Sequence, residues 1–185
     1  PSPAMLEAFC ETGWQALTRG VTLSGDAARK VFLRAAESGH KDGAWGLALA
    51  CDINLPNDVY AIEALCRASA EGHAAVVKFL LASTTDHNQR YMQKACRWAI
   101  LGGHTETARV FAASPVFDVN VVGRNGDTLF QLAARLGHAG IVQAFLSRLK
   151  KDGGLDSRAP VPLLSLPDVE GQPSLAEELS KALGA

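Results

Sequence analysis

The sequence predicts an all-α fold, a solenoid of helix-turn-helix units stacked one upon the next. Two markers carry this prediction. The dipeptide Gly-His recurs at intervals of 33, 31 and 34 residues, at 39–40, 72–73, 103–104 and 137–138. The pattern Asp-x-Asn keeps the same phase at intervals of 34 and 32 residues, at 52–54, 86–88 and 118–120. Two independent markers with one period indicate a repeated structural unit.

Each unit is predicted to be two helices joined at the glycine. Apolar or small residues stand four, five, eight and nine positions after it, as Ile141, Val142, Phe145 and Leu146 do in the fourth copy. This spacing is one stripe of a helix. An alanine four positions before the glycine and an apolar residue seven before it mark a first, shorter helix. Glycine can end that helix in the left-handed conformation without a steric penalty.

The Asp-x-Asn segments turn the chain back toward the next unit. Because one pair of helices cannot cover its own apolar face, the units must stack. We expect four core units over residues 26–150 and a degenerate N-terminal capping unit over 1–25. Residues 151–185 are expected to form a Pro/Gly-rich loop and a capping half-unit. Since the first residue is not Met, we also expect a processed product or a piece of a longer protein.

Composition narrows the class of partner. The chain has 18 basic and 19 acidic residues without a clustered basic excess, so we expect no nucleic-acid partner. No apolar run approaches the roughly 20 residues that cross a bilayer, so we expect no membrane partner. The four cysteines form no CxxC pair, which favours free thiols in a reducing, cytoplasmic location.

The histidines and tryptophans are the residues that first suggest chemistry. Stacked helices lie about 8–10 Å apart, whereas metal ligands lie about 2 Å from one ion, so the Gly-His histidines are predicted to form a structural ladder. We predict His87 to be a surface contact, Trp45 to be partly exposed and Trp98, at the position of Leu132, to lie in the core. No nucleophile elbow or phosphate-loop motif is present. The sequence therefore predicts no catalytic residue, cofactor or metal.

One segment resembles a known family. Residues 126–138, GDTLFQLAARLGH, resemble the G-x-T-P-L-H-L-A-A-x-x-G-H signature of the ankyrin repeat family, with departures at Leu129, Phe130 and Gln131. The D-V-N at 118–120 resembles the signature that precedes the family's hairpin finger. The first three copies lack the T-P-L-H segment. The resemblance implies an ankyrin-repeat solenoid whose fingers and first helices line a concave, partner-binding groove.

Carried over by position, the resemblance selects residues 13, 12 and 10 before each glycine and the last two before it. The protein-binding residues predicted in this way are Tyr60, Glu71, Arg90, Tyr91, Gln93, Leu101, Arg124, Asn125, Asp127 and Arg135. Both tyrosines of the chain fall on finger positions, and tyrosine and arginine are frequent in binding hot spots. Two interpretations of the tyrosines stay open: contact with a partner, or packing against the neighbouring finger.

The predicted function is recognition of another protein by a non-catalytic, monomeric module. The alternative is a substrate-recruiting domain of a larger enzyme. It rests on resemblance to secreted bacterial effectors that modify host proteins, including arginine ADP-riboxanases, and would place the chain and its partner in the host cytosol. A structural or self-associating array is the third hypothesis.

Overall fold

The computed structural model describes residues 25–50, 59–83, 89–119, 121 and 126–151. Over these residues it contains the helices α2 (Gly25–Glu37), α3 (Lys41–Ala50), α4 (Val59–Ala70), α5 (Ala74–Ser83), α6 (Gln89–Leu101), α7 (Thr105–Ala113), α8 (Leu129–Arg135) and α9 (Ala139–Lys151). The described ranges include no β-strand. Both predicted capping units lie almost entirely outside them, as do the Asp-x-Asn segments at 52–54 and 86–88.

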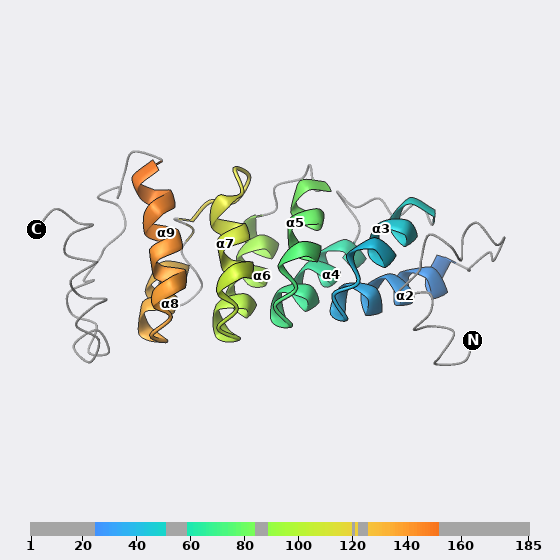
Figure 1. Cartoon of the computed structure of the whole chain (residues 1–185), viewed down its shortest axis with the longest axis horizontal. Coiled ribbons are helices and arrows are strands. Elements are labelled where there is room, and N and C mark those ends of the chain that lie inside the picture. Colours follow the sequence, from blue (N-terminus) through green and yellow to red (C-terminus); the bar gives the residue numbers. More distant parts are fainter. Residues whose placement is uncertain (1–24, 51–58, 84–88, 120, 122–125, 152–185) are drawn as a thin grey trace, which may run out of the picture.

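The helices form two layers that run along one axis (Figure 1). In one layer the first helices of the units, α2, α4, α6 and α8, follow one another in contact. In the other layer α3, α5, α7 and α9 do the same, and each second helix packs on the first helix of its own unit. The predicted all-α solenoid of helix-turn-helix units is therefore confirmed.

The turn inside each unit has the predicted geometry. Gly39, Gly72, Gly103 and Gly137 have φ angles of 78°, 81°, 70° and 74°. Such angles are costly for residues with a Cβ atom, which is why the repeat keeps glycine there. In the second unit, the backbone N–H of His73 donates to the carbonyl of Ala68 at 2.8 Å, which closes the end of α4.

The predicted histidine ladder is confirmed at His73 and His104, where it joins neighbouring units. His73 Nε2 lies 2.7 Å from the carbonyl oxygen of Glu37, and His104 Nε2 lies 2.8 Å from that of Ala70. A carbonyl oxygen only accepts hydrogen bonds, so Nε2 must carry the proton in both rings. Each imidazole thus bonds the first helix of the preceding unit. Across the described ranges, no three His, Cys, Asp or Glu side chains gather where they could hold a metal ion.

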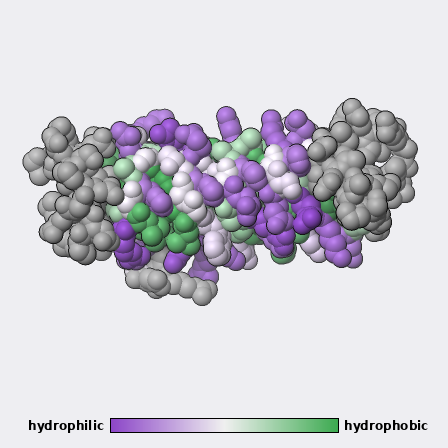
Figure 2. All heavy atoms as spheres, turned by 60° about the horizontal axis from the view of Figure 1, so that its bottom comes forward, coloured by the Kyte–Doolittle hydropathy of each residue, from purple (hydrophilic) through white to green (hydrophobic). Residues whose placement is uncertain are grey.

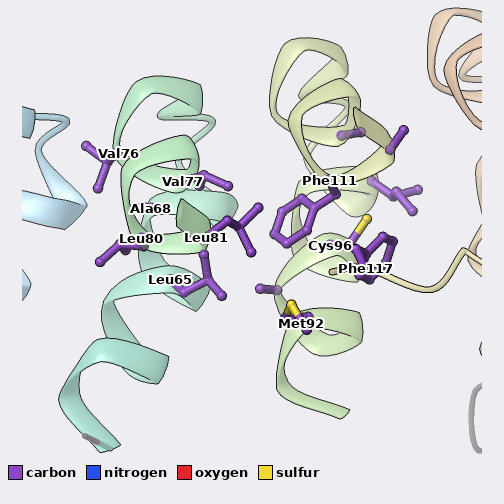
Figure 3. Close-up of a cluster of buried hydrophobic side chains, with 14 of the residues drawn as sticks. Leu65, Ala68, Val76, Val77, Leu80, Leu81, Met92, Cys96, Phe111 and Phe117 are labelled. Atoms are coloured by element: carbon purple, nitrogen blue, oxygen red, sulfur yellow. The ribbon is translucent and has the colours of Figure 1, made fainter. Parts of the chain in front are cut away.

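The core lies between the two layers and continues from unit to unit. Figure 3 shows side chains of two neighbouring units meeting there, among them Leu65, Val77, Leu81, Cys96 and Phe111. The Phe111 and Phe117 rings pack edge to face, with centroids 5.4 Å apart. Fully buried alanines, such as Ala68 and Ala99, let the first helices approach closely.

The two described cysteines are free thiols, as predicted. Cys96 is fully buried and Cys66 half-buried. Burial raises the pKa of both thiols, most strongly that of Cys96. A raised pKa keeps a thiol protonated and therefore unreactive, so both behave as small core residues. Cys10 and Cys51 lie outside the described ranges.

The prediction that the first helix of each unit is the shorter one is wrong for the first three units. Helices α2, α4 and α6 have 13, 12 and 13 residues, against 10, 10 and 9 in α3, α5 and α7. Only α8, with 7 residues, is shorter than its partner α9. In α8, Thr128 begins the helix late through a capping box with Gln131. The earlier units have no such stop, so their helices begin further upstream.

The longer helices correct a second prediction. Tyr60 lies in α4, and Arg90, Tyr91 and Gln93 lie in α6. None of these four is on a hairpin finger, because helix occupies the residues where the family signature has a finger. Their side chains therefore have the fixed spacing of a helix surface.

Candidate functional site

The exposed and half-exposed side chains of the first helices form one surface, which we call the first-helix face. On α2 and α4 it includes the charged residues Asp26, Arg29, Lys30, Arg34, Glu37, Glu63 and Arg67, together with the half-buried Tyr60 and the exposed Val59. On α6 and the end of α8 it consists of Arg90, Tyr91, Lys94, Arg97, Trp98, Leu101, Arg135 and Leu136. The first set is dominated by charged residues, and the second mixes basic with large apolar residues.

Trp98 is exposed, so its predicted place in the core is wrong. The indole is 46% exposed, whereas Leu132, at the same position of the fourth unit, is 7% exposed. The position lies at the border of the face, where a leucine reaches inward and the longer, rigid indole extends over the surface. Arg34 and Arg67 occupy this position in the first two units. Because arginine at this position indicates exposure to solvent, comparison with the first two units could have predicted that Trp98 is exposed.

The two tyrosines differ in environment. Tyr60 packs against the core, and the guanidinium of Arg29 lies 5.2 Å from its ring centroid, within range of a cation–π contact. Tyr91 is 42% exposed. Within the described part of the chain, the side chains of Tyr91 and Trp98 have no hydrogen-bond or ring partner. Of the two interpretations, packing within the chain therefore applies to Tyr60, whereas the side chain of Tyr91 remains available for contact with a partner.

Ion pairs hold the charged part of the face together. Arg67 bridges two carboxylates: its Nη2 lies 2.6 Å from Glu63 Oε1 and its Nη1 lies 3.2 Å from Glu37 Oε2. The hydrogen bonds that the Arg67 guanidinium donates to Glu63 are the main cause that raises the pKa of Arg67, and Glu37 adds to it. Glu63 belongs to the same helix and Glu37 to the preceding unit, so Arg67 connects α4 to α2.

The other predicted site residues fall into three groups. Gln93 is half-buried, and its amide donates to the carbonyl of Val121 at 3.1 Å, so this side chain holds the segment that follows α7. Arg135 pairs with Asp127 at 2.9 Å beside α8, and Glu71 is exposed in the turn between α4 and α5. Arg124 and Asn125 lie outside the described residues, as does His87.

Of the predicted residues, the structure thus brings Arg90, Tyr91 and Leu101 together on the exposed side of α6. It adds Trp98 to them, together with Leu136 from the end of α8. On the side drawn in Figure 2, hydrophobic residues gather over the end of the stack that holds α6–α9, and hydrophilic residues prevail toward α2 and α3. The two ends of one regular stack therefore have different surfaces.

Trp45 provides a contrast in the other layer. It lies on α3 and is 47% exposed, which confirms its predicted partial exposure. Its ring packs against Phe79 of α5, with centroids 5.0 Å apart. Trp45 therefore has an aromatic neighbour in the second layer, whereas the equally exposed Trp98 has none among the described residues.

The comparisons with known proteins agree with this architecture. A family model described as ankyrin repeats (3 copies) matches residues 65–156. The matched range begins within α4 and includes α6 and α8. No curated protein matches the chain. None of the helices in the described ranges is long and apolar enough to span a membrane.

Proposed function

The chain is a member of the ankyrin repeat family through residues 65–156, and from this premise we propose that it recognises a partner protein through the first-helix face, with α6 at the centre. Ankyrin repeats are generic protein-interaction modules. A stacked array offers a continuous surface on which residues can vary without changing the core. The proposal therefore concerns which part of that surface makes the contact.

The observation that carries the proposal is the exposure of Tyr91, Trp98 and Leu101 on one side of α6. Large apolar side chains that are grouped at a surface, rather than scattered, are typical of interaction sites. Tyrosine and tryptophan are enriched among the residues whose truncation weakens binding most. Leu136, at the end of the neighbouring first helix, is also exposed and adds a large apolar side chain to the first-helix face of the next unit.

Other predicted residues have supporting places in this proposal. Arg90 stands beside Tyr91 at the start of α6 and can donate hydrogen bonds to a partner. Glu71 and the Asp127–Arg135 pair belong to the units before and after that of α6, and charges at the edge of an interface affect association rate and selectivity more than affinity. Gln93 is assigned to its intramolecular bond with Val121 rather than to the partner.

Site-specific photo-crosslinking tests the proposal. A photoreactive phenylalanine analogue placed at Trp98 should capture one discrete protein from cytosolic lysate, and the same analogue at Trp45 should not. The two tryptophans match in type and exposure, at 46% and 47%, and differ in layer. Capture at position 45 alone, or equal capture at both positions, would contradict the proposal. A captured second copy of the chain would instead support the self-associating array.

Affinity measurements with the captured partner follow. Trp98→Ala combined with Leu101→Ala should weaken binding at least tenfold, or about 1.4 kcal/mol, because each truncation removes apolar contact area. Trp45→Ala should leave the affinity unchanged. All variants should keep the melting temperature of the wild-type chain to within about 3 °C, because exposed side chains contribute little to folding. A parallel loss of fold and binding would count against the face.

A further inference from the structure

The charges on α6 extend the proposed function to the kind of partner that fits. The helix carries three basic residues, Arg90, Lys94 and Arg97, and no acidic residue. Its neighbour α4 carries one of each sign, Arg67 and Glu63. The excess positive charge of the first-helix face is therefore concentrated on the helix that also bears the exposed aromatic side chains.

Helical spacing places these cations in a row. Arg90, Lys94, Arg97 and Leu101 follow one another at intervals of four, three and four residues, which is one line along a helix surface. All four side chains are exposed. Tyr91 and Trp98, seven residues apart, form a second line along the edge of this row. A partner that contacts the aromatic side chains must therefore also meet the cations.

The three cations of α6 have no ion-pair partner within the described ranges. In contrast, Arg67 on α4 pairs with two carboxylates, and Arg135 on α8 pairs with Asp127. Like charges at intervals of three and four residues repel one another and slightly destabilise a helix. A bound acidic group would relieve this repulsion as well as form charge-assisted hydrogen bonds.

Resting on the proposed function, we propose that this part of the face binds an acidic protein segment with apolar anchors. Carboxylates of the segment would pair with the row of cations, and its apolar side chains would cover Trp98, Leu101 and Leu136. Nucleic acid fits less well, because a continuous phosphate backbone would leave α6 and meet Glu63, Glu71 or Asp127 nearby. Such a ligand requires a broader basic surface, and this chain has as many acidic as basic residues to within one.

A peptide-display selection on the full chain tests the inference. Random peptides of about 16 residues can cover a 13-residue helix, whose length is about 20 Å. Sequences selected on the wild-type chain should be enriched in Asp and Glu interleaved with Leu, Phe or Trp. Counter-selection uses Trp98→Arg combined with Arg90→Gln, Lys94→Gln and Arg97→Gln. The inference would be overturned if neutral or basic peptides were enriched. It would also be overturned if the counter-selection removed none of the enriched peptides.

Fluorescence anisotropy with a selected peptide gives the quantitative test. The triple Gln variant of α6 should weaken binding at least tenfold, and raising the salt concentration from about 50 to about 300 mM should weaken binding to the wild-type chain. The matched control, Lys41→Gln with Lys78→Gln and Lys151→Gln, removes the same charge from exposed positions in the other layer and should change the affinity less than twofold. Equal effects of the two variants would show only a dependence on net charge and would overturn the inference.

Two further outcomes separate the inference from the proposed function. A single-stranded oligonucleotide of about 16 nucleotides that displaces the peptide at equal concentration would assign the row to nucleic acid and overturn the inference. If the partner captured at position 98 binds the triple Gln variant as tightly as the wild-type chain, recognition by the first-helix face stands and its acidic specificity falls. If nothing is captured at position 98, the proposed function itself fails.

Discussion

The unit that begins with α4 and the unit that begins with α6 have the same arrangement of helices, but the side chains of these two helices differ in their contacts with the preceding unit. In the first, Tyr60 lies under the guanidinium of Arg29, and Arg67 pairs with Glu37, both from α2. One unit further on, the residues at the positions of these two side chains are Tyr91 and Trp98.

The positions that would face them, held by Arg29 and Glu37 one unit earlier, are now Ile62 and Ala70. These residues have no charge to offer, and both aromatic side chains of α6 remain exposed. The comparison teaches that exposure on the first-helix face depends on the preceding unit as much as on the residue itself. Both units keep the same positions buried and the same histidine bond to the preceding first helix, so the surface varies while the stack persists.

The largest expected effect on stability comes from substitutions in the buried core, which both units share. Phe111→Ala removes a fully buried ring between them and should lower the free energy of unfolding by about 3–5 kcal/mol. Leu80→Ala, on the other side of the same cluster, should cost about 2–5 kcal/mol. Urea titrations followed by circular dichroism measure both. Each variant should unfold in one transition, whereas two separate transitions in Phe111→Ala would show that the units are not coupled.

The next effect distinguishes the junctions between units. A Cβ atom added at Gly72 would lie 2.5 Å from His104 Nδ1, but one added at Gly103 would lie 3.2 Å from His138 Cε1. Both glycines have left-handed φ angles, which alone cost about 1–2 kcal/mol with any other residue. Gly72→Ala should therefore destabilise the chain by about 2–3 kcal/mol and Gly103→Ala by about 1–2 kcal/mol.

A double-mutant cycle checks the cause of that difference. Gly72→Ala displaces the His104 ring, which bonds the Ala70 carbonyl at 2.8 Å. In a chain that already carries His104→Ala, the extra cost of Gly72→Ala should fall to the cost of the left-handed conformation. An unchanged cost in that background would show that the imidazole is not the obstacle.

A smaller effect on stability is expected from the ion pairs of Arg67, which connect α4 to α2. Arg67→Ala should lower the free energy of unfolding by less than about 1 kcal/mol, since the side chains of Arg67, Glu37 and Glu63 are each roughly two-fifths exposed and screened by water. The loss should shrink in high salt. Arg34→Ala, at the same position of the first unit, is the control, because Arg34 has no ion-pair partner among the described residues. A loss at Arg34 as large as that at Arg67 would contradict the role of the pairs.

Much of this fold could be predicted from the sequence because the repeat positions that determine it carry strong local signals. The glycine turns, the helix stripes and the histidine ladder all follow from residue types at fixed intervals. The starts of the first helices could not be predicted in this way. In the described ranges a capping box is present at Thr128 and Gln131, whereas Lys30, Glu63 and Lys94, at the position of Thr128 in the earlier units, lie inside helices.

The candidate site was predictable in part, and Trp98 shows where prediction failed. Comparison with Leu132 alone suggested a core position, although Arg34 and Arg67 at the same position indicated solvent. Exposure at a border position depends on the size of the side chain and on its neighbours in the preceding unit. Those neighbours are about 30 residues away in sequence and become visible only once the units are stacked.

The smallest expected effect on stability is also the sharpest test of the comparison. Trp98→Arg gives the α6 unit the residue that the first two units have at this position. Because the indole is nearly half exposed and has no ring or hydrogen-bond partner among the described residues, the free energy of unfolding should change by no more than about 0.5 kcal/mol. Partner binding should nevertheless fall at least tenfold, because the main apolar contact on the first-helix face is lost. Leu132→Arg, at the same position of the fourth unit but buried, must instead lower stability. If Trp98→Arg destabilised the chain as much as Leu132→Arg does, Trp98 would be part of the core after all, and the difference between the two units would be one of packing rather than of recognition.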